Sequence, residues 1–172
     1  MKRIGEVIAI QEPEITIEFY GSGSDCVVGM IVSTEDGNKF GIVHTIHSVL
    51  IEEGKVGQAF GSEQSTDEQL KQDFPHLKNS LRLLAKAYTW HQDNSPLLLN
   101  QGVYSNNQPE LLNKREYWQT VKLLPLPALE RHIAWLRTED DQFNDDIYLE
   151  KLSSMSRPLA WEIFLHQENK RG

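Results

Sequence analysis

Glu14-Ile15-Thr16-Ile17-Glu18-Phe19-Tyr20 is the stretch that decides the fold, because polar and apolar side chains alternate along most of its length. A period of two puts one face of a β-strand in a core and the other in water, and it excludes a helix. Three further apolar runs, separated by glycine, proline and acidic turns, read as strands at residues 4–10, 26–32 and 39–46. Together the four runs predict a small antiparallel β-barrel in the N-terminal part of the chain.

Four glycines are expected to be structural in this barrel. Gly5, Gly29 and Gly41 lie inside the predicted strands, where a glycine costs about 0.5–1 kcal/mol against alanine unless the backbone bends or another segment comes close. We expect these three at strand bends. Gly37 follows an aspartate in the turn at residues 35–38, and an Asp-Gly pair predicts a hairpin because glycine accepts positive φ.

The middle of the chain is less regular. Residues 48–62 are expected to add one or two short strands that close the barrel. From residue 66 the apolar spacing becomes helical, which predicts an inserted helix with Leu70, Phe74, Leu77 and Leu81 on one side. Residues 83–90 fit a strand and nearly as well a continuing helix. A strand at 97–104 is expected to return and pair with them.

The last third of the chain is helical by pattern. Helices are predicted after Asn107, around residues 129–136 and 147–155, and at a short terminal stretch. The sequence therefore predicts an α+β protein, with a barrel and inserted helix at residues 1–104 and an α-helical tail at residues 105–172. The tail holds Trp118, Trp135 and Trp161, which either build a helical core or form a docking surface for a partner.

The composition is that of an ordinary globular protein, with 39% hydrophobic and 24% charged residues in 172. No apolar run reaches the roughly 18 residues of a membrane-spanning helix, and the N-terminus leads straight into a strand, so we expect a cytoplasmic protein. The single cysteine, Cys26, excludes an internal disulfide and is expected to be buried in a strand. A net charge of −8 repels phosphate backbones.

Three segments carry a resemblance to a known family: Ile4-Gly5-Glu6-Val7-Ile8, the pattern Gly29-x-x-Val32-x-Thr34-x-Asp36-Gly37, and Gly41-Ile42-Val43. They resemble the HAS-barrel family, a barrel found at the N-termini of HerA-type DNA translocases and of ATP synthase subunits. Through the acidic helix at 66–74 and Pro75-x-Leu77-x-x-x-Leu81 the chain is similar to stand-alone bacterial HAS-barrel proteins. The resemblance ends at about residue 104.

The resemblance implies a noncatalytic barrel that mediates assembly or docks a protein, with a HerA-like hexameric ATPase or its associated nuclease as the partner. It supplies no catalytic, cofactor-binding or metal-binding residues, and the chain has no Walker lysine loop. The leading hypothesis is therefore an adaptor subunit and not an enzyme. The alternative is a single-stranded nucleic-acid-binding barrel, against which residues 1–62 carry nine acidic and four basic side chains.

Two metal sites were weighed against structural interpretations. His44 and His47 are three positions apart, so in a strand they lie on opposite faces and are not expected to share a metal. The acidic tract at residues 140–146 has the look of a calcium loop, but it lacks the glycine at the sixth position, and Lys151 stands where the closing glutamate belongs. We expect this tract to be a solvated loop that caps a helix.

Two catalytic arrangements were weighed in the same way. Glu14 and Glu18 are about 13 Å apart by strand rise, too far for paired acid and base work on one bond, and are expected on the wet face. Ser22 and Ser24 could serve as nucleophiles with His44 as the base, but no nucleophile-elbow pattern surrounds either serine. We therefore expect no hydrolase chemistry from these residues.

Overall fold

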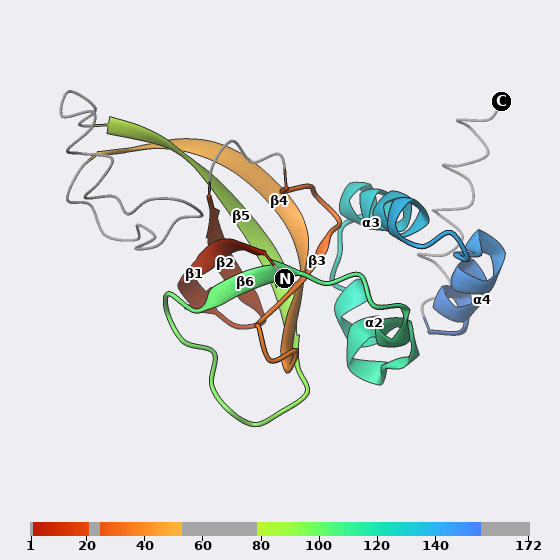
Figure 1. Ribbon diagram of the computed structural model, residues 1–172. Helices are drawn as coiled ribbons and strands as arrows, with labels where there is room; N and C mark the ends of the chain where they lie inside the picture. Colours follow the sequence, from red (N-terminus) through yellow and green to blue (C-terminus); the bar gives the residue numbers. More distant parts are fainter. Residues whose placement is uncertain (1, 21–24, 53–78, 156–172) are drawn as a thin grey trace, which may run out of the picture.

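The structure is a computed structural model, and it describes residues 2–20, 25–52 and 79–155. The predicted inserted helix up to residue 78, the residues at 53–62, Ser22, Ser24 and Trp161 lie outside the described residues. The helical placement of Leu81 is wrong, because this residue belongs to a strand that begins at Asn79. Among the described residues, a barrel of strands stands beside a layer of helices (Figure 1).

Six strands close into the predicted antiparallel barrel, in the order β1-β2-β5-β4-β3-β6. Every neighbouring pair is antiparallel, including β6 with β1, whose pairing completes the ring. Closure removes most exposed sheet edges, which lets even the short strands β3 and β6 take part in a stable sheet. The strands are β1 (Arg3–Gln11), β2 (Glu14–Phe19), β3 (Ile31–Ser33), β4 (Lys39–Glu52), β5 (Asn79–His91) and β6 (Gly102–Ser105).

The structure changes three of the predicted strands. Residues 83–90 are a strand, part of β5, and they do not pair with residues 102–105, because β2 and β4 already occupy both edges of β5. The returning strand β6 pairs with β1 and β3 instead. Residues 48–52 continue β4 and are not a separate strand. The third strand begins only at Ile31, because the chain before it turns at Gly29, whose φ is +97°.

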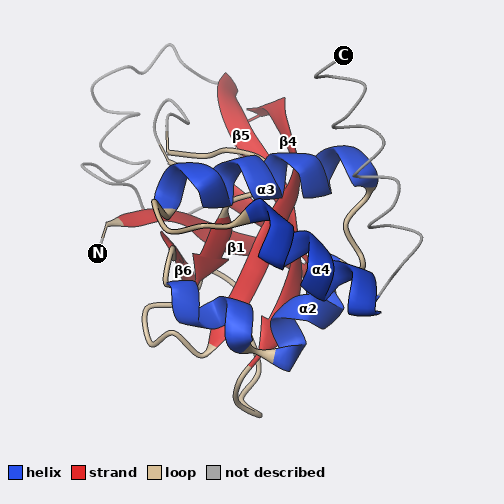
Figure 2. Cartoon of the chain, turned by 90° about the vertical axis from the view of Figure 1, so that its right-hand side faces the viewer, coloured by secondary structure: helices blue, strands red, loops and turns tan. Residues whose placement is uncertain are grey.

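Four helical segments follow the barrel and cover one side of it (Figure 2). The helix predicted after Asn107 is broken, because Lys114 is extended with φ −95° and ψ 134° and separates a 3-10 helix from α2. Pro125 precedes α3 with an extended backbone, as expected for a proline that stops one helix and starts the next. No described helix is both long and apolar enough to cross a membrane. The segments are η1 (Pro109–Asn113), α2 (Arg115–Val121), α3 (Leu126–Glu139) and α4 (Asp145–Met155).

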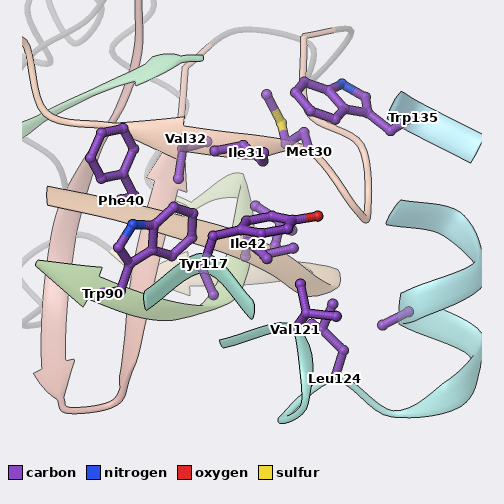
Figure 3. Packing of buried hydrophobic residues seen from close by; sticks show 14 of the residues in the cluster. Met30, Ile31, Val32, Phe40, Ile42, Trp90, Tyr117, Val121, Leu124 and Trp135 are labelled. Carbon is purple, nitrogen blue, oxygen red and sulfur yellow. The ribbon is translucent and has the colours of Figure 1, made fainter. Parts of the chain in front are cut away.

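One hydrophobic core joins the barrel to the helices. Phe40 and Trp90 stack with ring centroids 5.1 Å apart, and Trp90 meets Tyr117 of α2 edge to face at 5.8 Å (Figure 3). Ile42 and Tyr117 are fully buried in the same cluster. The helical layer is therefore packed directly on the outer face of β4 and β5, and this contact positions the surfaces described next.

The structure places the four glycines as follows. Gly37 has φ +71° in the turn between β3 and β4, as the Asp-Gly hairpin predicts. Gly5 lies in β1 at a register shift against β6, and Gly41 lies in β4 between Val32 and Thr89. The strand bend predicted at Gly29 is wrong, because this residue lies in a turn against α3. A Cβ on Gly29 would stand 2.5 Å from the backbone nitrogen of His132, so only glycine fits there.

Candidate docking site

The two strand histidines have different surroundings. His44 Nε2 lies 2.9 Å from Glu14 Oε2, and its ring stacks on Tyr88 with centroids 4.2 Å apart. His47 is exposed. Across the described ranges, no group of three or more histidine, cysteine, aspartate or glutamate side chains is arranged to hold a metal ion. Glu14 and Tyr88 therefore hold the His44 ring on the barrel surface, and among the described residues it is not part of a metal-binding group with His47.

Placing Glu18 on the wet face is wrong. Glu18 is 1% exposed, and it lies opposite Glu6, which is 2% exposed, in the β1·β2 ladder. Burying two carboxylates is costly unless cations lie close. Arg3 supplies one, with its Nη2 2.7 Å from Glu6 Oε1, and Arg82 Nε lies 3.9 Å from Glu18 Oε1. This buried ionic cluster is structural, and the alternation in β2 gave no sign of it.

The acidic tract at residues 140–146 caps α4 as expected. Asn144 Oδ1 accepts a hydrogen bond from the Ile147 backbone at 3.1 Å, and Asp140 Oδ1 accepts one from the Gln142 backbone at 2.9 Å. Asp145 forms a salt bridge with Arg137, whose Nη2 lies 2.8 Å from Asp145 Oδ2. These local hydrogen bonds and this salt bridge are those of a helix-capping loop.

A buried network of hydrogen bonds links the helices to one another and to the turn at Gly29. His132 is fully buried and donates from Nδ1 to the Gly29 carbonyl at 2.6 Å, which leaves Nε2 to accept from the Tyr117 hydroxyl at 2.6 Å. Tyr148 donates in turn to the Tyr117 oxygen at 2.8 Å. Burial lowers the pKa of His132 to about 4, although the hydrogen bond to Gly29 acts in the opposite direction. Every side-chain polar atom of this hydrogen-bond network has a partner, so the role of the network is structural.

Burial likewise decides the chemistry of the single cysteine. Cys26 is buried as predicted, although in a turn before β3 and not in a strand. Burial raises the pKa of its thiol to about 12, so the thiol stays protonated and unreactive near neutral pH.

Two of the three tryptophans singled out from the sequence, Trp118 and Trp135, lie in the core of the helical layer. Trp118 is 4% exposed and donates from its indole nitrogen to the Leu112 carbonyl at 2.8 Å, and Trp135 is 8% exposed. Both therefore support neighbouring surfaces from beneath. A part for them in docking stays a prediction.

A cleft lies between η1, α2 and α4, and we call it the helical cleft. Its volume is about 680 Å³, and apolar side chains form its floor. Ile147 lines it while keeping 65% of its surface exposed, so an apolar side chain is available to a partner at the cleft. The floor consists of Leu112, Trp118, Phe143, Ile147, Tyr148 and Met155.

The rim of the helical cleft is more basic than the chain as a whole. Arg115, Lys151 and Asp140 line it, whereas the whole sequence carries −8. Neither Arg115 nor Lys151 forms a salt bridge with another residue of the described part of the chain. An apolar floor beside unpaired cations is suited to an apolar segment that carries carboxylates.

A second cleft, between α3 and the turn before β3, is less distinctive. It measures about 620 Å³, and its charged lining is balanced, with Lys2 and Arg131 against Asp25 and Glu139. Lys2 and Asp25 already pair across 3.0 Å. The helical cleft is therefore the better candidate for docking. The sequence pattern predicted a helix around residues 147–155 but could not show that Ile147 remains exposed.

Comparison with known proteins adds no family to this picture. No protein-family model matches the chain. No curated protein matches its sequence either.

Proposed function

We propose that the protein is a noncatalytic assembly or adaptor subunit that docks a protein partner in the helical cleft. The observation that carries this proposal is the exposed Ile147 on an apolar floor, flanked by Arg115 and Lys151, for which the described residues offer no salt-bridge partner. Small apolar centres surrounded by polar rims are the usual anatomy of protein interfaces.

The energetics favour an apolar anchor in the partner. Fully burying one large aliphatic or aromatic side chain contributes about 1.5–3 kcal/mol, so covering Ile147 and filling the cleft supplies the centre of an interface. The cations contribute mainly to orientation and association rate, because exposed rim charges add little affinity. We therefore assign the affinity to Ile147 and its neighbours, and the choice of partner to Arg115 and Lys151.

The partner we propose presents an acidic segment with apolar anchors. A chain of net charge −8 repels acidic proteins, and the two cations that line the cleft reduce this repulsion locally. The resemblance of the N-terminal barrel to HAS-barrel proteins supports a HerA-like hexameric ATPase, or its associated nuclease, as the protein that carries this segment.

The test compares proteins captured from native lysate by the full chain and by matched variants. Ile147→Asp removes the apolar centre of the cleft, and the double variant Arg115→Glu/Lys151→Glu reverses the charge of its rim. Leu123→Asp and Lys122→Glu change exposed residues outside the cleft and serve as controls. Each captured ATPase or nuclease is then purified and titrated calorimetrically against all variants.

We expect a hexameric ATPase or its nuclease to be captured by the parent and by both controls, and to be lost with both cleft variants. The calorimetric affinity should fall at least about tenfold for Ile147→Asp, a difference near 1.4 kcal/mol. Capture of the same proteins by the parent and the cleft variants would overturn the proposal, and so would the absence of any ATPase or nuclease.

A further inference from the structure

The strands β4 and β5 continue well beyond the barrel. Their ladder runs from Lys39 opposite His91 to Glu52 opposite Asn79. The ladders on the other sides of these two strands are shorter. Strand β3 pairs with β4 only at residues 40–42, and β2 pairs with β5 only at residues 83–88. Among the described residues the far end is therefore a two-stranded ribbon, and Figure 1 shows it projecting away from the helical layer. We call residues 49–52 and 79–82 the arm.

One edge of the arm has the properties of a docking edge. Along residues 45–52 of β4, no strand within the described ranges pairs with the side opposite β5. Such a row of backbone N–H and C=O groups is a template for another strand, and natural edges are usually protected by charges or proline. Residues 45–51 read Thr-Ile-His-Ser-Val-Leu-Ile, with no charged residue, proline or glycine, in a chain that is 24% charged.

We propose that this edge pairs with the same edge of a second copy, so that two chains form a dimer through antiparallel β4 strands. Two-fold symmetry sets residues of the uncharged segment opposite one another, which avoids like-charge pairs although each chain carries −8. Pairing also adds strands to a ribbon that has only two within the described ranges, and two strands alone are marginal in water whereas four are not. The dimer goes beyond the proposed adaptor function and does not use the helical cleft.

The experiment places charges at the middle of the edge. Ser48 is exposed, lies at the centre of residues 45–51, and can be changed to Lys or to Glu without disturbing the core. The full-length parent, Ser48→Lys, Ser48→Glu and the control Gln119→Lys, an exposed position on α2, are compared by sedimentation velocity over a range of concentrations. Near-ultraviolet circular dichroism of each variant reports whether the tryptophan core remains folded.

We expect the parent and Gln119→Lys to be dimers, and each Ser48 variant alone to dissociate with a dimer constant at least about tenfold weaker. Mixing the two Ser48 variants should restore a dimer with one chain of each kind, which a merely destabilised fold would not do. A parent that stays monomeric at all concentrations overturns the proposal, as does a Ser48→Lys protein that dimerises like the parent. The variants of the helical cleft should remain dimers. If the dimer proposal fails, the adaptor proposal can therefore still be tested on its own.

Discussion

His132 of α3 donates a hydrogen bond from Nδ1 to the backbone carbonyl oxygen of Gly29, over 2.6 Å. The same glycine adopts φ +97° and leaves no room for a Cβ, because that atom would stand 2.5 Å from the His132 backbone nitrogen. The turn that leads into β3 is therefore fitted against α3 at one point, and this point joins the barrel to the helical layer. Substituting Gly29, or protonating His132, should therefore change the stability of the protein measurably.

Gly29→Ala should destabilise the protein by about 2 kcal/mol or more, because it adds a backbone clash to an unfavourable positive φ. Gly37→Ala is the matched control: its φ is +71°, but nothing lies within 4 Å of the added Cβ. It should therefore cost only about 1 kcal/mol, from backbone strain alone. Urea midpoints at constant slope measure both. Equal losses for the two variants would show that the contact with α3 contributes nothing.

Stability should fall as the pH is lowered from 7 to 5. Burial depresses the pKa of His132 from 6.5 to about 4, so between these values the unfolded chain binds more protons than the folded one. The contribution of the neutral ring is fully present above pH 6.5 and is lost as the pH falls toward 4. The expected loss from His132 is about 2 kcal/mol between pH 7 and pH 5.

The measurement is urea unfolding of the parent and of His132→Gln at both pH values. The variant is less stable at each pH, but it should lose about 2 kcal/mol less than the parent when the pH is lowered, because the titrating group is gone. Parallel pH profiles for the two proteins would contradict the assignment to His132.

In β4, a substitution at Gly41 should reduce the stability more than a substitution at His44. A Cβ at Gly41 would meet the Ala87 methyl at 3.2 Å and Val32 Cγ2 at 3.5 Å, so Gly41→Val overpacks the barrel and should cost about 1–3 kcal/mol. The His44 ring is not on an open wet face, since it bonds to Glu14 and stacks on Tyr88, so His44→Ala should cost up to about 1 kcal/mol. Urea midpoints decide the order, and a larger loss at His44 would reverse it.

The barrel could be predicted because its signals are local. Alternation from Glu14 to Phe19 and the Asp-Gly turn at Gly37 depend on neighbours in sequence, and the structure confirms the strand and the hairpin. The pairing of β6 depended on which strand edges remained open, and no local pattern contains that information. The same limit hid the burial of Glu18, whose cation Arg82 is 64 residues away in the chain.

The candidate site was only partly predictable for the same reason. The apolar residues at 147–155 predicted the helix α4, but the exposure of Ile147 depends on what packs beside it. His132 gave no sequence signal, because its partners Gly29 and Tyr117 are brought to it by the packing of α2 and α3 on the barrel. A histidine amid apolar helical positions was the only available hint.

Single-stranded nucleic acid should not bind measurably. A binding barrel needs a basic groove with stacking aromatics, whereas residues 1–62 carry nine acidic and four basic side chains, and Lys39 is already paired with Asp93 at 2.8 Å. A labelled oligonucleotide titrated at about 50 mM salt, where phosphate contacts are strongest, should show no change in anisotropy. Tight binding that weakens steeply with added salt would instead make the barrel a nucleic-acid-binding module. The cleft variant Arg115→Glu/Lys151→Glu would then show whether the helical layer supplies the phosphate contacts.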